Sequence, residues 1–318
     1  MVKTNVRAPK TSFANRLVWR AHRFKLGWLV KGPLSALHLR EKLHRRAAAR
    51  ATRREQDDAA AVNQLRTAGW TVVTPFAEPS LLQALSDAGA ARVQRADELA
   101  RTQTLTHKSF WMRLLDDDLV DGRFPADNVF VRFAMQPGVV SVIGRYFGET
   151  PLLVDVLLTL SRDTGEAPSA SQLWHKDYDD RHTVKMFVYL TDVRDTDDGP
   201  FTFLPAPASD RLGVTLRSHL PDNKVFARIA RSAAIEMRGP AFTTFLCETS
   251  RCLHMGSRLA PGHSRLMYTA TYVPAPMAYP DYRPKFRATA SLRRRACRSI
   301  AGRPRPDWTV SRPNWEQA

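Results

Sequence analysis

The feature that most constrains this chain is a pair of potential metal ligands, His175 and Asp177, which are separated by one residue and matched by His254 much further along the sequence. In an extended segment, side chains two residues apart point to the same side, so His175 and Asp177 can face one ion. Two imidazoles and one carboxylate form the facial ligand set of non-heme Fe(II), which leaves the opposite positions open for O2 and an organic co-substrate. The fold must therefore bring a second strand, carrying His254, alongside the first.

An arginine follows the distal histidine. Arg265 opens a segment of alternating character that predicts a strand, on which it shares a face with Met267 and Thr269. A guanidinium is permanently charged and grips a carboxylate through two hydrogen bonds, which suits the far carboxylate of a 2-oxo acid. Two alternatives stay open: His263 competes as the distal ligand, and Arg258 competes as the co-substrate arginine.

Further polar residues flank this set. Lys185, Phe187 and Tyr189 share one face of a predicted strand. If that face looks into the fold, Lys185 or Tyr189 can hydrogen-bond the co-substrate; the alternative places Lys185 in solvent. We interpret three polar residues after the first ligands as solvated loop residues or substrate contacts, and the tryptophan before them as core: Asp179, Asp180, His182 and Trp174.

Longer stretches around these residues extend the pattern. They read QLWHKDYDD at 172–180, TVKMFVYLTDV at 183–193, GPFTFLP at 199–205, CLHMGS at 252–257 and SRLMYTATYV at 264–273. Over residues 66–275 the chain resembles the phytanoyl-CoA dioxygenase-like family of Fe(II)/2-oxoglutarate-dependent oxygenases. That family often follows its glycine turn with Pro-Gly-Ser-His, whereas residues 204–210 here read LPAPASD, so the loop on the substrate side departs from the family pattern.

The resemblance implies a specific site and reaction. His175, Asp177 and His254 would hold Fe(II), and Arg265 would bind the co-substrate 2-oxoglutarate. The enzyme would be a dioxygenase that consumes O2, hydroxylates an unactivated C–H of a small organic substrate, and releases succinate and CO2. The family covers acyl-CoA thioesters, amino acids and natural-product intermediates, so the substrate is not specified.

The positive charge of the chain lies mainly in its two ends. Residues 1–54 carry a net charge of +14 and residues 281–318 carry +7; since the whole chain carries +17, subtracting both leaves −4 for residues 55–280. A mildly acidic central region disfavours a basic groove that follows a phosphate backbone, so we do not expect nucleic acid as a partner. Basic arms fit an anionic membrane surface or an acidic protein better.

Composition sets the broad class. With 43% hydrophobic and 25% charged residues, the chain reads as a soluble globular protein with a sizeable core. Three scattered cysteines, Cys247, Cys252 and Cys297, show neither a zinc-type spacing nor a disulfide framework, which indicates a reducing cytoplasm. We find no apolar run long enough for a membrane span and no secretory signal; peripheral membrane association stays open.

Periodicity predicts the order of elements. Helices are expected at residues 11–31 (ending at Gly32-Pro33), 34–66, 79–100, 138–147 and 222–235, and strands at 69–73, 152–160, 184–190, 201–204, 241–247 and 265–273. Helices followed by short strands predict an α+β fold with a double-stranded β-helix, a cupin-like jelly-roll barrel with flanking helices. Such a barrel can bring strands from distant parts of the chain around one metal site.

Three regions are expected: a basic helical N-terminal extension at residues 1–60, an Fe(II)/2-oxoglutarate oxygenase jelly-roll domain at 61–280, and a basic, poorly ordered C-terminal tail at 281–318. The region from about residue 55 onward should carry the iron chemistry by itself, because the arms contain no part of the ligand set. In the N-terminal extension, a helical stripe at Phe13, Leu17, Ala21, Phe24 and Trp28 has two readings. It either docks on the domain or lies on a membrane surface.

Other functional classes stay open. A nucleic-acid- or nucleotide-directed 2-oxoglutarate oxygenase would require a basic, aromatic-lined groove in the central region. A non-catalytic jelly-roll binding protein would be expected to show a broken ligand set. A cupin-type isomerase would use more histidine ligands and no co-substrate arginine.

Overall fold

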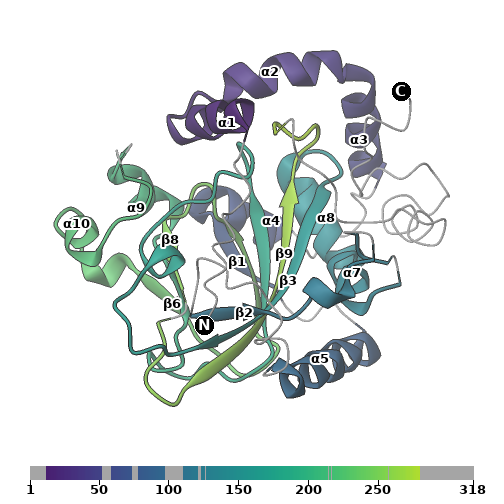
Figure 1. The fold of residues 1–318 in the computed structure, drawn as a ribbon. Coiled ribbons are helices and arrows are strands. Elements are labelled where there is room, and N and C mark those ends of the chain that lie inside the picture. The colour runs from purple at the N-terminus through teal and green to yellow at the C-terminus, as the bar shows by residue number, and fades with distance from the viewer. Residues whose placement is uncertain are drawn as a thin grey trace.

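A six-stranded antiparallel sheet forms the centre of the molecule (Figure 1). The computed structural model describes residues 12–51, 59–73, 78–96, 110–120, 123–125, 127–213, 215, 217–256 and 258–279. The strands of the large sheet run in the order β1 (Trp70–Val72), β7 (Thr244–Glu248), β4 (Val184–Tyr189), β9 (Ser264–Val273), β3 (Leu152–Arg162) and β2 (Trp111–Arg113). A second, three-stranded sheet contains β6 (Ile235–Met237), β5 (Phe201–Phe203) and β8 (His254–Met255), also antiparallel.

Helices cover the outer face of the large sheet. They are α4 (Ala59–Ala68), α5 (Pro79–Gln94), α7 (Val129–Ala134) and α8 (Pro137–Phe147). Alternate residues of β4 and β9, such as Met186, Val188 and Ala270, pack in one hydrophobic cluster with these helices. Tyr268 on the same face donates a hydrogen bond from its hydroxyl to the carbonyl of Phe130 in α7. This face therefore forms the main core.

The opposite face of the large sheet looks toward the small sheet. Phe187 and Tyr189 of β4 pack with Phe201 and Phe203 of β5 in a second cluster. Lys185, Phe187 and Tyr189 share one face of β4, as the alternation predicted, and the structure shows that this is the inner face, which the sequence had left open. Isolated bridges, including one between His175 and His254, extend the pairing between segments around the small sheet.

The fold is a mixture of helices and antiparallel sheets. Among the described residues the two sheets do not close into one hydrogen-bonded barrel, so the double-stranded β-helix of the jelly-roll kind stays a prediction. Two short helices, α9 (Ala206–Arg211) and α10 (Asp222–Phe226), flank the small sheet. The 3-10 turn η2 (Asp116–Asp118) follows β2 and pairs with Arg92 of α5, and two further 3-10 turns are η3 (Ala170–Gln172) and η4 (Arg231–Ala233).

The N-terminal segment forms three helices, α1 (Phe13–Arg23), α2 (Gly27–Leu37) and α3 (Leu39–Ala51), which arch over one end of the sheets in Figure 1. The expected stop at Gly32-Pro33 is wrong, because Pro33 lies inside α2. The first break comes earlier, where Lys25 adopts a left-handed backbone with φ 60°. Pro33 is the seventh residue of α2, so it removes the hydrogen bond that a backbone N–H at this position would give to the carbonyl of Leu29. The helix continues beyond it, and the N–H of His38 donates to the carbonyl of Leu34 at 3.0 Å.

The predicted helix at 222–235 is also too long. The chain forms α10, then η4, and then enters β6 at Ile235. The expected C-terminal tail at 281–318 lies outside the described residues. Within the part of the chain that the structure describes, no helix combines the length and the apolar character needed to cross a bilayer.

Candidate functional site

The candidate site begins with a pairing of two short segments. The backbone N–H of His175 donates to the carbonyl of His254, and the N–H of His254 donates back to His175, each at 2.9 Å. The backbone N–H of Asp177 donates to the carbonyl of Thr249 at 3.0 Å. The chain after β7 thus lies beside the segment that carries His175 and Asp177, although the two are far apart in sequence.

This pairing brings the three predicted ligands together. Potential ligand atoms of His175, Asp177 and His254 all lie within 4.8 Å of one another. Nε2 of His254 is 3.4 Å from Oδ2 of Asp177, and Nε2 of His175 is 3.9 Å from Oδ1 of the same carboxylate. Two imidazoles and a carboxylate therefore converge on one point, as the spacing predicted.

The orientation of both imidazoles fits a metal. Nδ1 of His175 lies 2.8 Å from the carbonyl oxygen of Leu173, and Nδ1 of His254 lies 2.9 Å from that of Cys252. A carbonyl can only accept, so each Nδ1 carries the proton and each Nε2 presents its lone pair toward Asp177. Metal-binding histidines commonly have their second nitrogen fixed in this way.

The charge states also fit. Burial lowers the pKa of His175 to about 3, with a further contribution from neighbouring His254, so its imidazole is neutral at pH 7. Burial alone would raise the pKa of Asp177, but the charge of Lys185 and the contact with His254 hold it well below its usual range. A neutral imidazole and an ionised carboxylate are the forms that bind a divalent cation.

Lys185 lies at the edge of this cluster. Its Nζ is 2.8 Å from Oδ2 of Asp177 and 3.8 Å from the carboxylate of Asp179. The alternative that Lys185 points into solvent is not what the structure shows, since its side chain is only 19% exposed. Lys185 thus contacts the carboxylate of Asp177, and its contact with the co-substrate stays a prediction.

Arg265 lies on the inner face of β9 and is buried. It donates a hydrogen bond to the carbonyl of Gly199, and its guanidinium carbon lies 5.8 Å from the ring centre of Tyr189. A Cβ built on Gly256, two residues after His254, would come 3.8 Å from the guanidinium. Arg265 therefore lies beside the strand that carries the distal histidine, where a positive charge could hold the far end of a short dicarboxylate.

The ring of Tyr189 faces Arg265, whereas its hydroxyl is already hydrogen-bonded within the protein. The hydroxyl donates to the carbonyl of Met237 at 2.9 Å and accepts from the backbone N–H of Phe201 at 3.0 Å. These two bonds tie β4 to the small sheet. The predicted hydrogen bond from Tyr189 to the co-substrate stays a prediction.

Aromatic rings pack against His254 on the inner face. The ring of Phe201 stacks on His254 with 5.3 Å between centroids and lies 4.4 Å from the ring of Phe187. Such packing fixes the orientation of His254 and makes the surroundings apolar.

The competing residues take other positions. His263 lies in an exposed turn, with Nδ1 3.0 Å from Oδ1 of Asp198. Arg258 makes two hydrogen bonds of 2.9 Å to Asp222 and a third, of 2.7 Å, to the carbonyl of Gln172. His263 and Arg258 thus make their hydrogen bonds to residues other than His175, Asp177 and His254.

One loop residue, Asp180, differs from its interpretation as solvated, whereas His182 is 40% exposed and makes one contact with a buried carboxylate. Asp180 is fully buried, with Oδ2 2.8 Å from Nζ of Lys31 in α2. Nδ1 of His182 lies 2.6 Å from the buried carboxylate of Glu248. Trp174 is core, as expected, and donates from Nε1 to Asp222.

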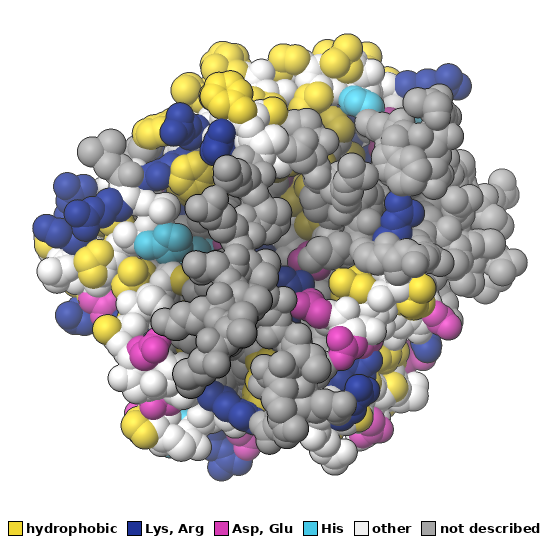
Figure 2. Space-filling view, viewed as in Figure 1, with side chains coloured by type: hydrophobic (Ala, Val, Ile, Leu, Met, Phe, Trp, Pro, Cys, Tyr) yellow, Lys and Arg dark blue, Asp and Glu magenta, His cyan; other side chains and the backbone are white. Residues whose placement is uncertain are grey.

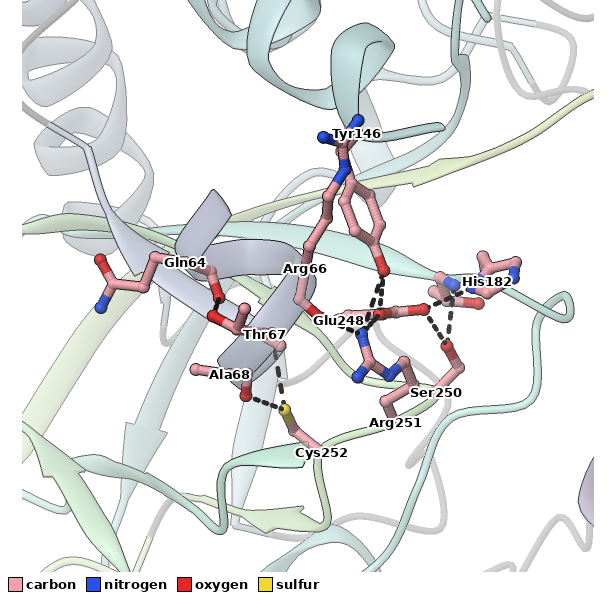
Figure 3. Close-up of polar contacts among 12 residues, drawn as sticks. Gln64, Arg66, Thr67, Ala68, Tyr146, His182, Glu248, Ser250, Arg251 and Cys252 are labelled. Carbon is pink, nitrogen blue, oxygen red and sulfur yellow. Dashed lines mark hydrogen bonds and ion pairs between the residues drawn. The ribbon is translucent and has the colours of Figure 1, made fainter. Parts of the chain in front are cut away.

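Glu248 organises the turn that leads to His254 (Figure 3). Besides His182, its carboxylate accepts hydrogen bonds from Tyr146, Ser250 and Arg251. The turn that follows carries the carbonyl of Thr249, which holds the backbone of Asp177. Sequence reasoning missed this network, because its members are scattered and no spacing marks them. It also missed His219, whose ring stacks on His175 with 5.2 Å between centroids.

The chain shares its fold with crystal structures of non-heme iron enzymes. No protein-family model matches the chain, and no curated protein matches it by sequence. The α-ketoglutarate-dependent epimerase SnoN from nogalamycin biosynthesis is 16% identical, with a TM-score of 0.51 over 81% of this chain and 94% of that chain. EctD from S. alaskensis, with 2-oxoglutarate and 5-hydroxyectoine, is 14% identical, with a TM-score of 0.53 over 80% and 87%. Identities this low establish a common fold and nothing finer.

Proposed function

We propose that this protein is an Fe(II)- and 2-oxoglutarate-dependent dioxygenase that hydroxylates an unactivated C–H bond of a small organic substrate. The observation that carries the proposal is the convergence of His175, Asp177 and His254, with both Nδ1 atoms held by backbone carbonyls. This ligand set leaves half of an octahedron open, which the chemistry of O2 and a chelating 2-oxo acid requires.

The residues of the chain divide the work. The two imidazoles and Asp177 would hold Fe(II), which when bound supplies the oxidative chemistry. Arg265 would bind the far carboxylate of 2-oxoglutarate through a bidentate contact and so orient the co-substrate along the inner face of β9. Phe187 and Phe201 would exclude water from this face, and Lys185 would keep the carboxylate of Asp177 ionised.

The structural neighbours support this proposal at the level of cofactors. A crystal structure of SnoN contains Fe3+, α-ketoglutarate and nogalamycin RO, with a TM-score of 0.50 and 15% identity over 74% of this chain and 89% of that chain. SnoN is described as an epimerase, whereas EctD was crystallised with a hydroxylated compound. The neighbours thus differ in their reactions, and we propose hydroxylation for this chain from its own ligand set.

The test is an anaerobic titration of the full-length protein. Fe(II) followed by 2-oxoglutarate should give the visible charge-transfer band of the chelate, and O2 should then release succinate, at a higher rate when a substrate from a small-molecule panel fits. Asp177→Ala should abolish the band and the succinate. The matched control is the exposed Asp197→Ala, which should behave as wild type. Wild-type protein that binds Fe(II) but gives neither band nor succinate with 2-oxoglutarate would refute the proposal.

A further inference from the structure

The outward sides of α1, α2 and α3, with the turn between α1 and α2, carry an extended apolar surface. Its large side chains are between 43% and 80% exposed: Phe13, Leu17, Phe24, Leu26, Trp28, Leu29, Leu37, Leu39 and Leu43, called here the apolar crest. Figure 2 shows yellow side chains gathered along the top of the molecule, over α1 and α2. Among the described residues, the other large hydrophobic side chains this exposed are Val72 and Val120. Exposed apolar surface is thus concentrated on one feature, as at an interaction site.

Helix α2 is inverted relative to an ordinary surface helix. Its single charged residue, Lys31, is buried, while Trp28, Leu29 and Leu37 point outward. A surface helix of a globular protein buries its apolar stripe and presents its charges to water. The reversal indicates that the outer face of α2 meets something other than water.

The inversion is fixed by a polar socket. Nζ of Lys31 lies 2.8 Å from Oδ2 of Asp180 and donates to the carbonyls of Pro274, at 2.7 Å, and Pro276. Turning α2 to bury its apolar face would pull Lys31 out of this socket and leave Asp180 buried without a cation, which is strongly unfavourable. The crest is therefore held outward by the folded structure.

Contacts on its inner side also fix the orientation of helix α1. The ring of Trp19 meets Tyr178 edge-on at 5.5 Å, and the guanidinium of Arg23 donates to the carbonyl of Thr215 at 2.8 Å. The inner sides of α1 and α2 thus rest on the loop after Asp177, and their outer sides are left for a partner.

A basic rim borders the apolar crest. Five exposed cations lie on these helices or in the turn between α1 and α2: Arg16, Arg20, Lys25, Arg40 and Arg46. Residues 12–51 contain ten Lys and Arg and one acidic residue, Glu41. Aromatic and leucine side chains flanked by cations are typical of helices that lie in the interface of an anionic bilayer.

We propose that the apolar crest docks this protein on the surface of an anionic lipid bilayer, with α1, α2 and α3 lying in the interface. A second copy of the chain fits less well, because the two basic rims would face each other and repel. An acidic protein surface would satisfy the cations and leave the aromatic and leucine side chains unexplained. The proposal does not depend on the chemistry proposed for the metal site.

The experiment is flotation of full-length protein with vesicles of phosphatidylcholine alone or with phosphatidylglycerol added. Wild type should bind the anionic vesicles, more weakly at high salt because exposed charges are screened within ~8 Å at physiological ionic strength. Replacing Phe24, Trp28 and Leu29 together with serine should weaken this binding at least about tenfold, since their apolar area no longer enters the interface. Val120→Ser, at an exposed apolar position outside the crest, is the matched control and should bind as wild type.

Three results would overturn the proposal. One is wild-type protein that binds neither vesicle. Another is a triple variant that binds anionic vesicles as tightly as wild type, which would reduce the interaction to charge alone. The third is a wild-type dimer in sedimentation equilibrium that the triple variant loses while vesicle binding is unaffected, which would assign the crest to a second copy. The far-ultraviolet circular dichroism and the Fe(II) affinity of the triple variant should equal those of wild type, which confirms that it is folded.

Discussion

Nζ of Lys185 lies 2.8 Å from Oδ2 of Asp177, so a strand cation meets the carboxylate of the candidate metal site. Burial alone would lower the pKa of Lys185, but the carboxylates of Asp177 and Asp179 outweigh it and raise the pKa above its ordinary value. Without a metal, Lys185 is thus the main cation that compensates Asp177. With a metal bound, the carboxylate gains a second cation.

Lys185→Met should therefore destabilise the metal-free protein more than the loaded one. Removing one partner of a largely buried ion pair costs about 3 kcal/mol here, the low end of the usual range, because both side chains are partly exposed. Thermal unfolding with and without Mn(II), used as a stable substitute for Fe(II), should show a larger metal-induced rise in Tm for Lys185→Met than for wild type. An equal rise in both proteins would contradict this role.

Arg265→Ala should weaken 2-oxoglutarate binding. Loss of a buried charge-assisted pair costs roughly 2–5 kcal/mol, so the apparent constant for 2-oxoglutarate should rise at least about tenfold. Arg258→Ala is the matched control, because Arg258 is committed to Asp222. Anaerobic titration measures the constant; the opposite ranking of the two variants would move the co-substrate site to Arg258.

His254→Ala should abolish Fe(II) binding, and His263→Ala should leave it unchanged. Nε2 of His254 faces Asp177, whereas His263 is in an exposed turn beside Asp198. Removing one of three protein ligands leaves too few to hold the ion, while removing an exposed imidazole changes no ligand. Fe(II) affinity by competition with a chromogenic chelator distinguishes the two, and retained binding in His254→Ala would disprove the distal assignment.

Glu248→Gln should flatten the acid side of the stability curve. Burial alone would raise the pKa of Glu248, but hydrogen bonds from His182 and Tyr146 and the charge of Arg251 hold it below 4.5. The unfolded chain then binds more protons than the folded protein between the two pKa values. The stabilisation from Glu248 is complete above pH 4.5 and is lost as the pH falls through its folded pKa.

Urea midpoints between pH 3 and 7 measure this effect. Wild type should lose stability toward low pH more steeply than Glu248→Gln, whose amide does not titrate. A variant with the same slope as wild type would show that other groups dominate the acid transition.

Local sequence pattern was sufficient to predict the direction of many side chains in this protein. Alternation along β4 and β9 predicted that Phe187 shares a face with Lys185 and Met267 with Arg265, and the spacing of His175 and Asp177 placed both ligands on one side. These features depend on near neighbours in the sequence, which fix side-chain direction through backbone geometry. The three ligands therefore meet where the sequence predicted, although their role as ligands stays a proposal.

Contacts between distant segments could not be predicted in this way. The stripe from Phe13 to Trp28 shows a helical period, but a period does not tell whether the stripe faces protein or surroundings. In the structure Phe13 is 67% exposed and Trp28 is 55% exposed. The orientation of the stripe depends on the ion pair between Lys31 and Asp180, and nothing in the sequence distinguishes Asp180 from other acidic residues in loops.

The Lys31–Asp180 pair bears on the prediction that the chain from about residue 55 onward suffices for iron binding. A truncation starting at Gln56 removes Lys31 and leaves the buried Asp180 without its cation, three residues from Asp177. Breaking such a pair costs about 3–5 kcal/mol, whereas replacing both partners by neutral groups is often close to neutral. Lys31→Met should thus lower the free energy of unfolding by about that amount, and Lys31→Met with Asp180→Asn should recover more than half of it.

Urea unfolding of wild type, Lys31→Met, Asp180→Asn and the double variant completes a double-mutant cycle, which measures the coupling free energy between Lys31 and Asp180. If the pair is coupled as the structure shows, the Gln56 truncation should unfold at lower urea than wild type, and Asp180→Asn should raise the midpoint of the truncated protein. Strictly additive effects, or a truncation with wild-type stability and iron affinity, would show that the N-terminal helices rest on the loop without supporting it, and the boundary near residue 55 would then hold.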